Sequence, residues 1–210
     1  SMAKPFVNPF VSGQFLELRV DALVSEGRGL GRHDGVVVLV EDALPGQLVR
    51  ARVAAVRKSL AEAALVEVLE RSPDEQEPPC PHAGRCGGCS WQSLAYGRQL
   101  AWKERIVHDA LERVGKMACP PMLPILPSPS EWGYRNKMEF AFGVSGDGGK
   151  ALGLRERGSR NIVEVTGCLL QTPLTMRVLE AVRMLSNGAF HDLDAVSYTH
   201  LRAHETRHDL

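Results

Sequence analysis

Three of the five cysteines in this 210-residue chain lie within ten positions, in the stretch CPHAGRCGGCSWQ that runs from Cys80 to Gln92. Cys80, Cys86 and Cys89 are spaced C-x5-C-x2-C, and the closer pair encloses two glycines. An odd number of clustered cysteines favours metal binding over a disulfide framework. Glycines between thiolates let the backbone fold closely around inorganic sulfur and offer unhindered amide donors, so the pattern indicates an iron–sulfur cluster.

A fourth thiolate would have to come from elsewhere in the chain, and Cys119 and Cys168 are the candidates. Cys168 follows a glycine at the end of an expected strand, VEVTGC, whereas Cys119 lies in a proline-rich loop. We therefore expect Cys168 to complete the site. A four-thiolate zinc site is the alternative, but such sites usually take two close cysteine pairs and only one is present here.

Composition narrows the class of protein. The 25 basic and 25 acidic residues cancel, so overall charge suggests no nucleic-acid partner and any basic surface must arise by local clustering. The start, SMAKPFVNPF, has no apolar core of a signal peptide, and no run of about 18 apolar residues could span a membrane. We expect a cytoplasmic monomer without a membrane partner.

The order of patterns predicts two domains of an α+β fold. Residues 1–13 are expected to form an N-terminal extension, and alternating apolar residues between turn signals at 14–71 predict a small OB-like β-barrel. The polar stretch 71–79 resembles a linker. Residues 72–195 are expected to form a small central α+β domain that bears the cysteines. It includes a helix at 93–115 with Leu100, Val107, Leu111 and Val114 on one face, and a second helix at 172–188 that Thr172 can cap.

The cysteine stretch, together with EWGYRNKMEFAFG, LGLRERGSRNIVEV and GCLLQ, resembles the bacterial RNA uracil-5 methyltransferases that carry a 4Fe–4S cluster, of the type acting on 23S ribosomal RNA. EGRGLGRHDGVVVLVEDALPGQLVRARV resembles the RNA-binding TRAM domain of those enzymes. The resemblance covers about residues 12–188. It implies that a 4Fe–4S cluster is held by Cys80, Cys86, Cys89 and Cys168, and that the partner is RNA, ribosomal rather than transfer RNA.

The resemblance also gives meaning to cations that would otherwise be read as solvated or paired surface residues. Single-stranded RNA is recognised by cations that meet phosphates and by aromatic rings that meet unstacked bases. The residues expected to contact RNA lie in the glycine-rich loop of the first segment and in two later segments: Arg28, Arg32, Arg135, Lys137, Phe140, Arg155, Arg157 and Arg160.

Two other motifs lead to functions that we do not adopt. The string EGRGLGRH has the glycines of a nucleotide-binding loop, but it leads into an expected strand rather than a helix. His204 and His208 form an H-E-x-x-H zinc-protease motif two residues from the end. The surrounding SYTHLRAHETRHDL is similar to translated sequencing-adapter DNA, so residues 196–210 are expected to be a non-native tail.

By the resemblance, S-adenosylmethionine is the cofactor of the full-length enzyme only. Its Rossmann-like domain, cofactor loop, nucleophilic cysteine and general base would follow the part present here. We therefore expect that the Rossmann-like domain is absent, that this chain holds neither catalytic nor cofactor-binding residues, and that it is an inactive fragment of the enzyme. The alternative is a stand-alone RNA-binding module with a structural four-cysteine metal site.

Overall fold

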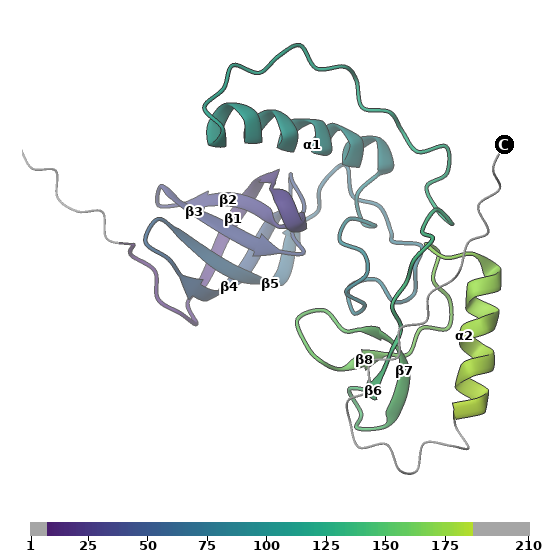
Figure 1. Cartoon of the computed structure of the whole chain (residues 1–210). Coiled ribbons are helices and arrows are strands. Elements are labelled where there is room, and N and C mark those ends of the chain that lie inside the picture. The colour runs from purple at the N-terminus through teal and green to yellow at the C-terminus, as the bar shows by residue number, and fades with distance from the viewer. Residues whose placement is uncertain (1–7, 187–210) are drawn as a thin grey trace, which may run out of the picture. The chain divides into compact units, whose positions relative to one another are not determined.

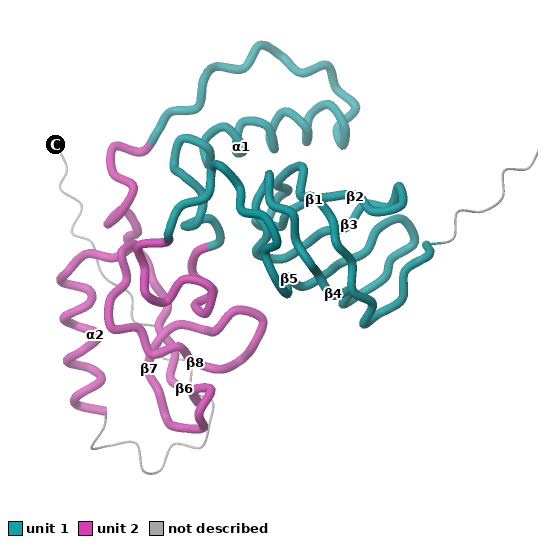
Figure 2. The backbone as a smooth tube through the Cα atoms, turned by 180° about the vertical axis from the view of Figure 1, so that it is seen from behind, with its two compact units in different colours: residues 1–77, 90–127 teal, residues 78–89, 128–210 magenta. Residues whose placement is uncertain are grey.

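The computed structural model describes residues 8–186 and divides into two compact units (Figure 2). The first unit contains the residues up to 77 together with 90–127, and the second contains 78–89 together with those from 128 onward. The chain thus enters the second unit for the cysteine loop, returns to the first, and crosses again. The His204–His208 motif and the tail 196–210 lie outside the described residues.

The first unit is built on a closed five-stranded barrel in the order β1-β2-β3-β5-β4 (Figure 1). Neighbouring strands are antiparallel except β3 and β5, which run parallel. The strands are β1 (Phe15–Leu23), β2 (Gly29–His33), β3 (Val36–Glu41), β4 (Leu48–Val56) and β5 (Leu60–Glu70).

The alternation of the sequence explains the barrel core. In β1, Leu16, Leu18 and Val20 are buried while the residues between them are exposed, the period of two expected for a strand with one wet face. Within the barrel, Gly31 on β2 lets the backbone of β1 come close, because a Cβ at Gly31 would lie 2.3 Å from the carbonyl oxygen of Arg19. Glycine at this point therefore lets β1 and β2 pair tightly.

Helix α1 (Tyr96–Asp109), continued by a π turn η2 (Ala110–Val114), belongs to the barrel unit. The sequence analysis had assigned helix 93–115 to the central α+β domain, whereas α1 groups with the barrel. The physical reason is Trp102, which is 7% exposed and clusters with Leu23, Leu44 and Leu94. The face predicted from sequence is not the buried one, because Val107 is 50% exposed.

The expected linker at 71–79 is partly anchored. Ser72 is buried, and the side chain of Gln47 donates a hydrogen bond of 2.9 Å to the Glu75 carboxylate. The start of this stretch is therefore part of the barrel unit and does not form an unanchored linker.

The second unit contains a three-stranded antiparallel sheet in the order β6-β7-β8 and helix α2 (Pro173–Ser186) (Figure 1). Thr172 caps α2 as predicted, because its hydroxyl accepts the Thr175 amide at 3.3 Å. The strands are β6 (Ala141–Val144), β7 (Lys150–Arg155) and β8 (Ile162–Val163), and the core is formed by Met138, Phe140, Leu152, Leu154, Val163, Val165, Leu170 and Leu179.

The segment just before β6, residues 133–140, does not form a strand. Its backbone pairs instead with the chain that follows Cys168: Gly133 donates to the Leu169 carbonyl at 2.8 Å and Arg135 to the Leu170 carbonyl at 3.0 Å.

No helix among residues 8–186 is long and apolar enough to cross a membrane.

We expect Trp102→Ala to lower the free energy of unfolding by about 3 kcal/mol, because it removes the largest apolar contact between α1 and the barrel. Val107→Ala on the same helix should change it by no more than about 0.5 kcal/mol, since Val107 is largely in water. Urea denaturation followed by circular dichroism measures both. Equal losses would show that α1 does not dock through Trp102.

Candidate functional site

Four of the five thiols converge in the second unit. Cys86, Cys89 and Cys168 are half-buried and pack against the same apolar core. The thiol of Cys80 is close enough to act electrostatically on both Cys86 and Cys168. Cys119 belongs to the other unit. The four predicted ligands, Cys80, Cys86, Cys89 and Cys168, are therefore brought together in the second unit. Their binding of a metal stays a prediction.

The cysteine loop (residues 80–89) is joined to the turn after β7 by main-chain hydrogen bonds. The Gly87 amide donates to the Arg155 carbonyl at 3.0 Å, and the Arg157 amide donates to the Arg85 carbonyl at 2.8 Å. An antiparallel bridge connects the same two segments. The guanidinium of Arg157 also donates to the carbonyl of Cys89. The loop therefore pairs with the C-terminal end of β7, the central strand of the sheet, and has a defined position.

The glycine pair has the role that its small size suggests. The Gly88 amide donates to the sulfur of Cys86 at 3.4 Å, and a Cβ on Gly88 would stand 3.4 Å from that same sulfur. Amide donors directed at cysteine sulfur are a recurring feature of iron–sulfur sites.

His82 joins the cysteine loop to the segment that carries Cys168, a role that the sequence analysis missed. The Thr166 amide donates to Nε2 of His82 at 3.2 Å. The Thr166 hydroxyl lies 3.3 Å from the same nitrogen. A histidine two positions after the first cysteine was the available signal.

Burial raises the pKa of the Cys86 thiol, and the neighbouring Cys89 and Cys80 raise it further against the opposing Gly88 amide. The pKa of Cys168 is also raised, mainly by burial and then by Cys89 and Cys80, while the amides of Leu170 and Gln171 oppose the shift. Clustered half-buried thiols are therefore costly to ionise unless a metal compensates their charge.

The arrangement of the donor atoms suits some metal centres and not others. Within residues 8–186 no group of three or more histidine, cysteine, aspartate or glutamate side chains is arranged to hold a single metal ion. A cubane cluster makes a different demand, because each of its irons takes one thiolate and the four sulfurs lie farther apart than around one ion. Four converging thiols with amide donors fit that chemistry.

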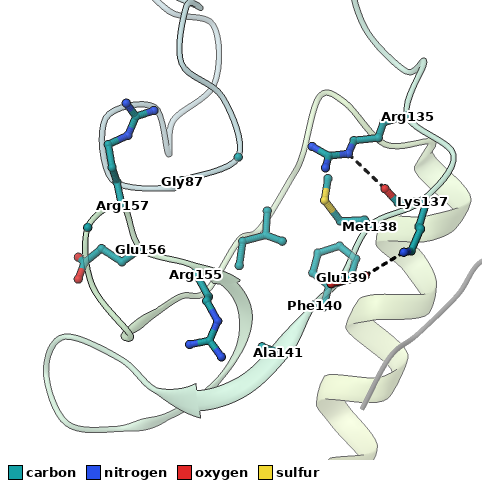
Figure 3. Close-up of a pocket in the computed structure, with 13 residues that line it drawn as sticks. Gly87, Arg135, Lys137, Met138, Glu139, Phe140, Ala141, Arg155, Glu156 and Arg157 are labelled. Atoms are coloured by element: carbon teal, nitrogen blue, oxygen red, sulfur yellow. Dashed lines mark hydrogen bonds and ion pairs between the residues drawn. The ribbon is translucent and has the colours of Figure 1, made fainter. Parts of the chain in front are cut away.

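A pocket of about 590 Å³ lies beside the cysteine loop, entirely within the second unit (Figure 3). Arg135, Lys137 and Met138 follow one side, and the turn after β7 forms the other. Its lining consists of Gly87, Gly88, Arg135, Lys137, Met138, Glu139, Phe140, Ala141, Leu154, Arg155, Glu156, Arg157 and Gly158.

The charged groups of the pocket differ in their partners. Nε of Arg135 donates to the Lys137 carbonyl at 3.2 Å, and the Lys137 ammonium lies 2.9 Å from the Glu139 carboxylate. Hydrogen bonds from the Ser159 hydroxyl and the Asn161 amide lower the pKa of Glu156. Four cations and two carboxylates thus surround the pocket, which leaves it positive.

The residues expected to contact RNA separate into two groups. Arg135, Lys137, Phe140, Arg155 and Arg157 line the pocket, and Arg160 lies nearby without lining it. Arg28 and Arg32 belong to the barrel unit, where Arg28 pairs with Glu26 at 3.1 Å and Arg32 is exposed on β2. Phe140 is only 5% exposed, so its ring is part of the core that forms the pocket floor. Contact with RNA stays a prediction for all of them.

Sequence similarity to known proteins extends across both units. The TRAM domain profile matches residues 9–66. An "Uncharacterized RNA methyltransferase" of Nitratidesulfovibrio vulgaris is 47% identical over 180 residues, which is 86% of this chain and 38% of that protein. The 23S rRNA (uracil(1939)-C(5))-methyltransferase RlmD of Acidithiobacillus ferrooxidans is 37% identical over 88% of this chain and 41% of its own length.

The fold also has a solved counterpart. The Pyrococcus abyssi tRNA (uracil-54, C5)-methyltransferase, crystallised with S-adenosyl-L-homocysteine, matches 82% of this chain and 37% of its own, with a TM-score of 0.56 and 24% identity. At this identity the likeness concerns the fold alone. The family resemblance read from the sequence is confirmed: the chain contains a TRAM domain and is related to RNA methyltransferases.

The expectation that a Rossmann-like methyltransferase domain is absent is contradicted by the same comparisons. The chain spans only 38% of its relative from Nitratidesulfovibrio vulgaris and 37% of the solved methyltransferase. The five-stranded barrel and the second sheet are therefore one part of a longer architecture in the relatives.

In the reduced, metal-free chain we expect iodoacetamide to label Cys86 and Cys168 more slowly at pH 8 than in the urea-unfolded chain. The raised pKa of each thiol leaves less reactive thiolate at this pH, and labelling should accelerate as the pH rises through the shifted pKa. Mass spectrometry of each cysteine peptide gives the rates. Equal rates in the folded and unfolded chain at pH 8 would contradict the burial argument.

Proposed function

We propose that this chain, a TRAM-domain relative of the RNA methyltransferases, is the RNA-recognition part of an S-adenosylmethionine-dependent RNA uracil-5 methyltransferase. The observation that carries the proposal is sequence identity across both units, which extends over 86% of the chain in one relative and 88% in another. The basic pocket and the exposed Arg32 on the barrel supply cations on each unit that suit a phosphate backbone.

Ribosomal RNA is the substrate we favour. The relative named as a 23S rRNA methyltransferase is 37% identical, whereas the solved transfer RNA methyltransferase is 24% identical. Both names place the methyl group on C5 of uracil, so the choice concerns the RNA and not the reaction.

We assign the chemistry of methyl transfer to the part of the relatives that this chain does not span. The reaction needs a thiolate that adds to C6 of uracil, so that C5 becomes nucleophilic, and a base that later removes the C5 proton. S-adenosylmethionine supplies the methyl group. The residues described here would bind the RNA and orient it, which is the role suited to a barrel and a basic pocket.

We further propose that Cys80, Cys86, Cys89 and Cys168 hold a 4Fe–4S cluster. The thiols converge, one of them accepts an amide hydrogen bond, and the loop that carries three of them is fixed to the β7 turn. Such a cluster would cross-link the cysteine loop to the segment after β8. Its contribution in this chain would be to hold those segments together.

The first test is metal content. We expect about four irons and four sulfides per chain after anaerobic purification, the composition of a cubane held by four thiolates. Cys168→Ser should lower the iron content sharply, while Cys119→Ser, in the other unit, should leave it unchanged. Stoichiometric zinc without iron would support a structural zinc site instead. Equal losses of iron in the two variants would contradict the assignment of Cys168 as the fourth ligand.

The second test is binding of single-stranded ribosomal RNA at increasing salt. Each phosphate contact releases counterions, so log affinity should fall with log salt by about 0.7 per contact. Arg32→Gln should reduce that slope by about one contact, and Arg113→Gln on η2, where the side chain pairs with Asp109, should not. Binding is measured by fluorescence anisotropy. If the chain shows no salt-dependent RNA binding, the proposed function is wrong.

A further inference from the structure

The pocket beside the cysteine loop combines an apolar floor with a positively charged rim. Its floor includes Met138, Phe140 and Leu154, each no more than 7% exposed. Its rim carries Arg135 and Lys137 on one side and Arg155 on the other (Figure 3). A simple anion would use only the rim, and an apolar ligand would use only the floor.

We propose that this pocket binds a single unstacked nucleotide of an RNA strand, with the base on the apolar floor and the phosphate at the Arg135 rim. The inference rests on the proposed RNA-recognition function and adds the location and size of one binding site. A base has a flat apolar face and its phosphate a full negative charge, so a nucleotide matches both surfaces together.

The size of the pocket supports one nucleotide. Small-ligand sites typically enclose about 300–1,000 Å³, and this pocket encloses about 590 Å³. A stacked or paired base could not present its face to a concave floor, so the nucleotide must be single-stranded. Arg135 is exposed, and its side-chain hydrogen bond among residues 8–186 uses Nε, which leaves the terminal nitrogens of the guanidinium to face a phosphate.

The cysteine loop forms one wall of this site. Gly87 and Gly88 line the pocket, and both lie between Cys86 and Cys89. The wall is held by the main-chain bonds to the β7 turn and by the Arg157 bond to the Cys89 carbonyl. Because the same residues that shape the wall stand beside the thiols, nucleotide binding here depends on the ligation of the cysteines.

The probes are uridine 5′-monophosphate and a short oligouridine, added to the whole 210-residue chain purified anaerobically. We expect the nucleotide to shift the amide NMR signals of Gly87, Gly88 and Glu139. Arg135→Gln should weaken oligouridine binding by about tenfold, the loss of one charged hydrogen-bonding group. Arg177→Gln on α2 is the matched control, an exposed arginine of the same unit outside the pocket.

A second arm removes the metal with a chelator and repeats both titrations. Loss of ligation should weaken binding of the mononucleotide several-fold. Unchanged binding would overturn the dependence on the cysteine loop. Arg135→Lys keeps the charge without the forked geometry, so an intermediate affinity from a chain with an unaltered NMR spectrum supports a direct phosphate contact.

The outcomes separate this inference from the function on which it rests. If oligouridine binds and the Arg135→Gln and Arg177→Gln variants behave alike, the pocket is not the site, while RNA recognition stands. If neither probe binds the unmodified chain under any salt condition, both the pocket and the RNA-recognition function are wrong.

Discussion

The second unit depends on main-chain pairing between two segments that are far apart in the sequence. The cysteine loop and the turn after β7 exchange amide hydrogen bonds of 3.0 and 2.8 Å, and the Arg157 guanidinium spans 68 positions to reach the Cys89 carbonyl. Backbone donors and acceptors that leave water must find partners. The loop finds them at the C-terminal end of β7, the central strand of the sheet, and its cysteines are thereby brought toward Cys168.

Arg157 shows how one pattern of charge can serve two purposes. The sequence analysis assigned Arg155, Arg157 and Arg160 alike to RNA, yet the half-buried Arg157 holds the cysteine loop and also lowers the cost of a thiolate at Cys86. Arg135, across the pocket, is exposed and leaves its terminal nitrogens toward solvent. A guanidinium whose terminal nitrogen already donates to a carbonyl, as in Arg157, contributes less to a phosphate than one that uses only Nε, as in Arg135.

Local rules were enough for part of this structure. The alternation in β1 and the Thr172 cap of α2 follow from side-chain period and hydrogen-bonding chemistry, which act over a few residues. The docking of α1 through Trp102 did not follow, because the helix has apolar residues on more than one face and only the barrel decides which is buried. The pocket could not be predicted from the sequence either, because its walls come from three segments that only the tertiary fold assembles.

The Gly87-Gly88 pair contributes both to the thiol site and to the pocket. Without side chains, the two residues let an amide approach the Cys86 sulfur and leave the pocket wall open. A Cβ at Gly88 would be in ordinary contact with the Cys86 sulfur at 3.4 Å, and one at Gly87 would lie 3.3 Å from the Arg155 carbonyl oxygen, which is tighter than usual. The same absence of side chains thus serves the thiol site on one side of the loop and the nucleotide pocket on the other. The two sites share a backbone, so neither can change shape without the other.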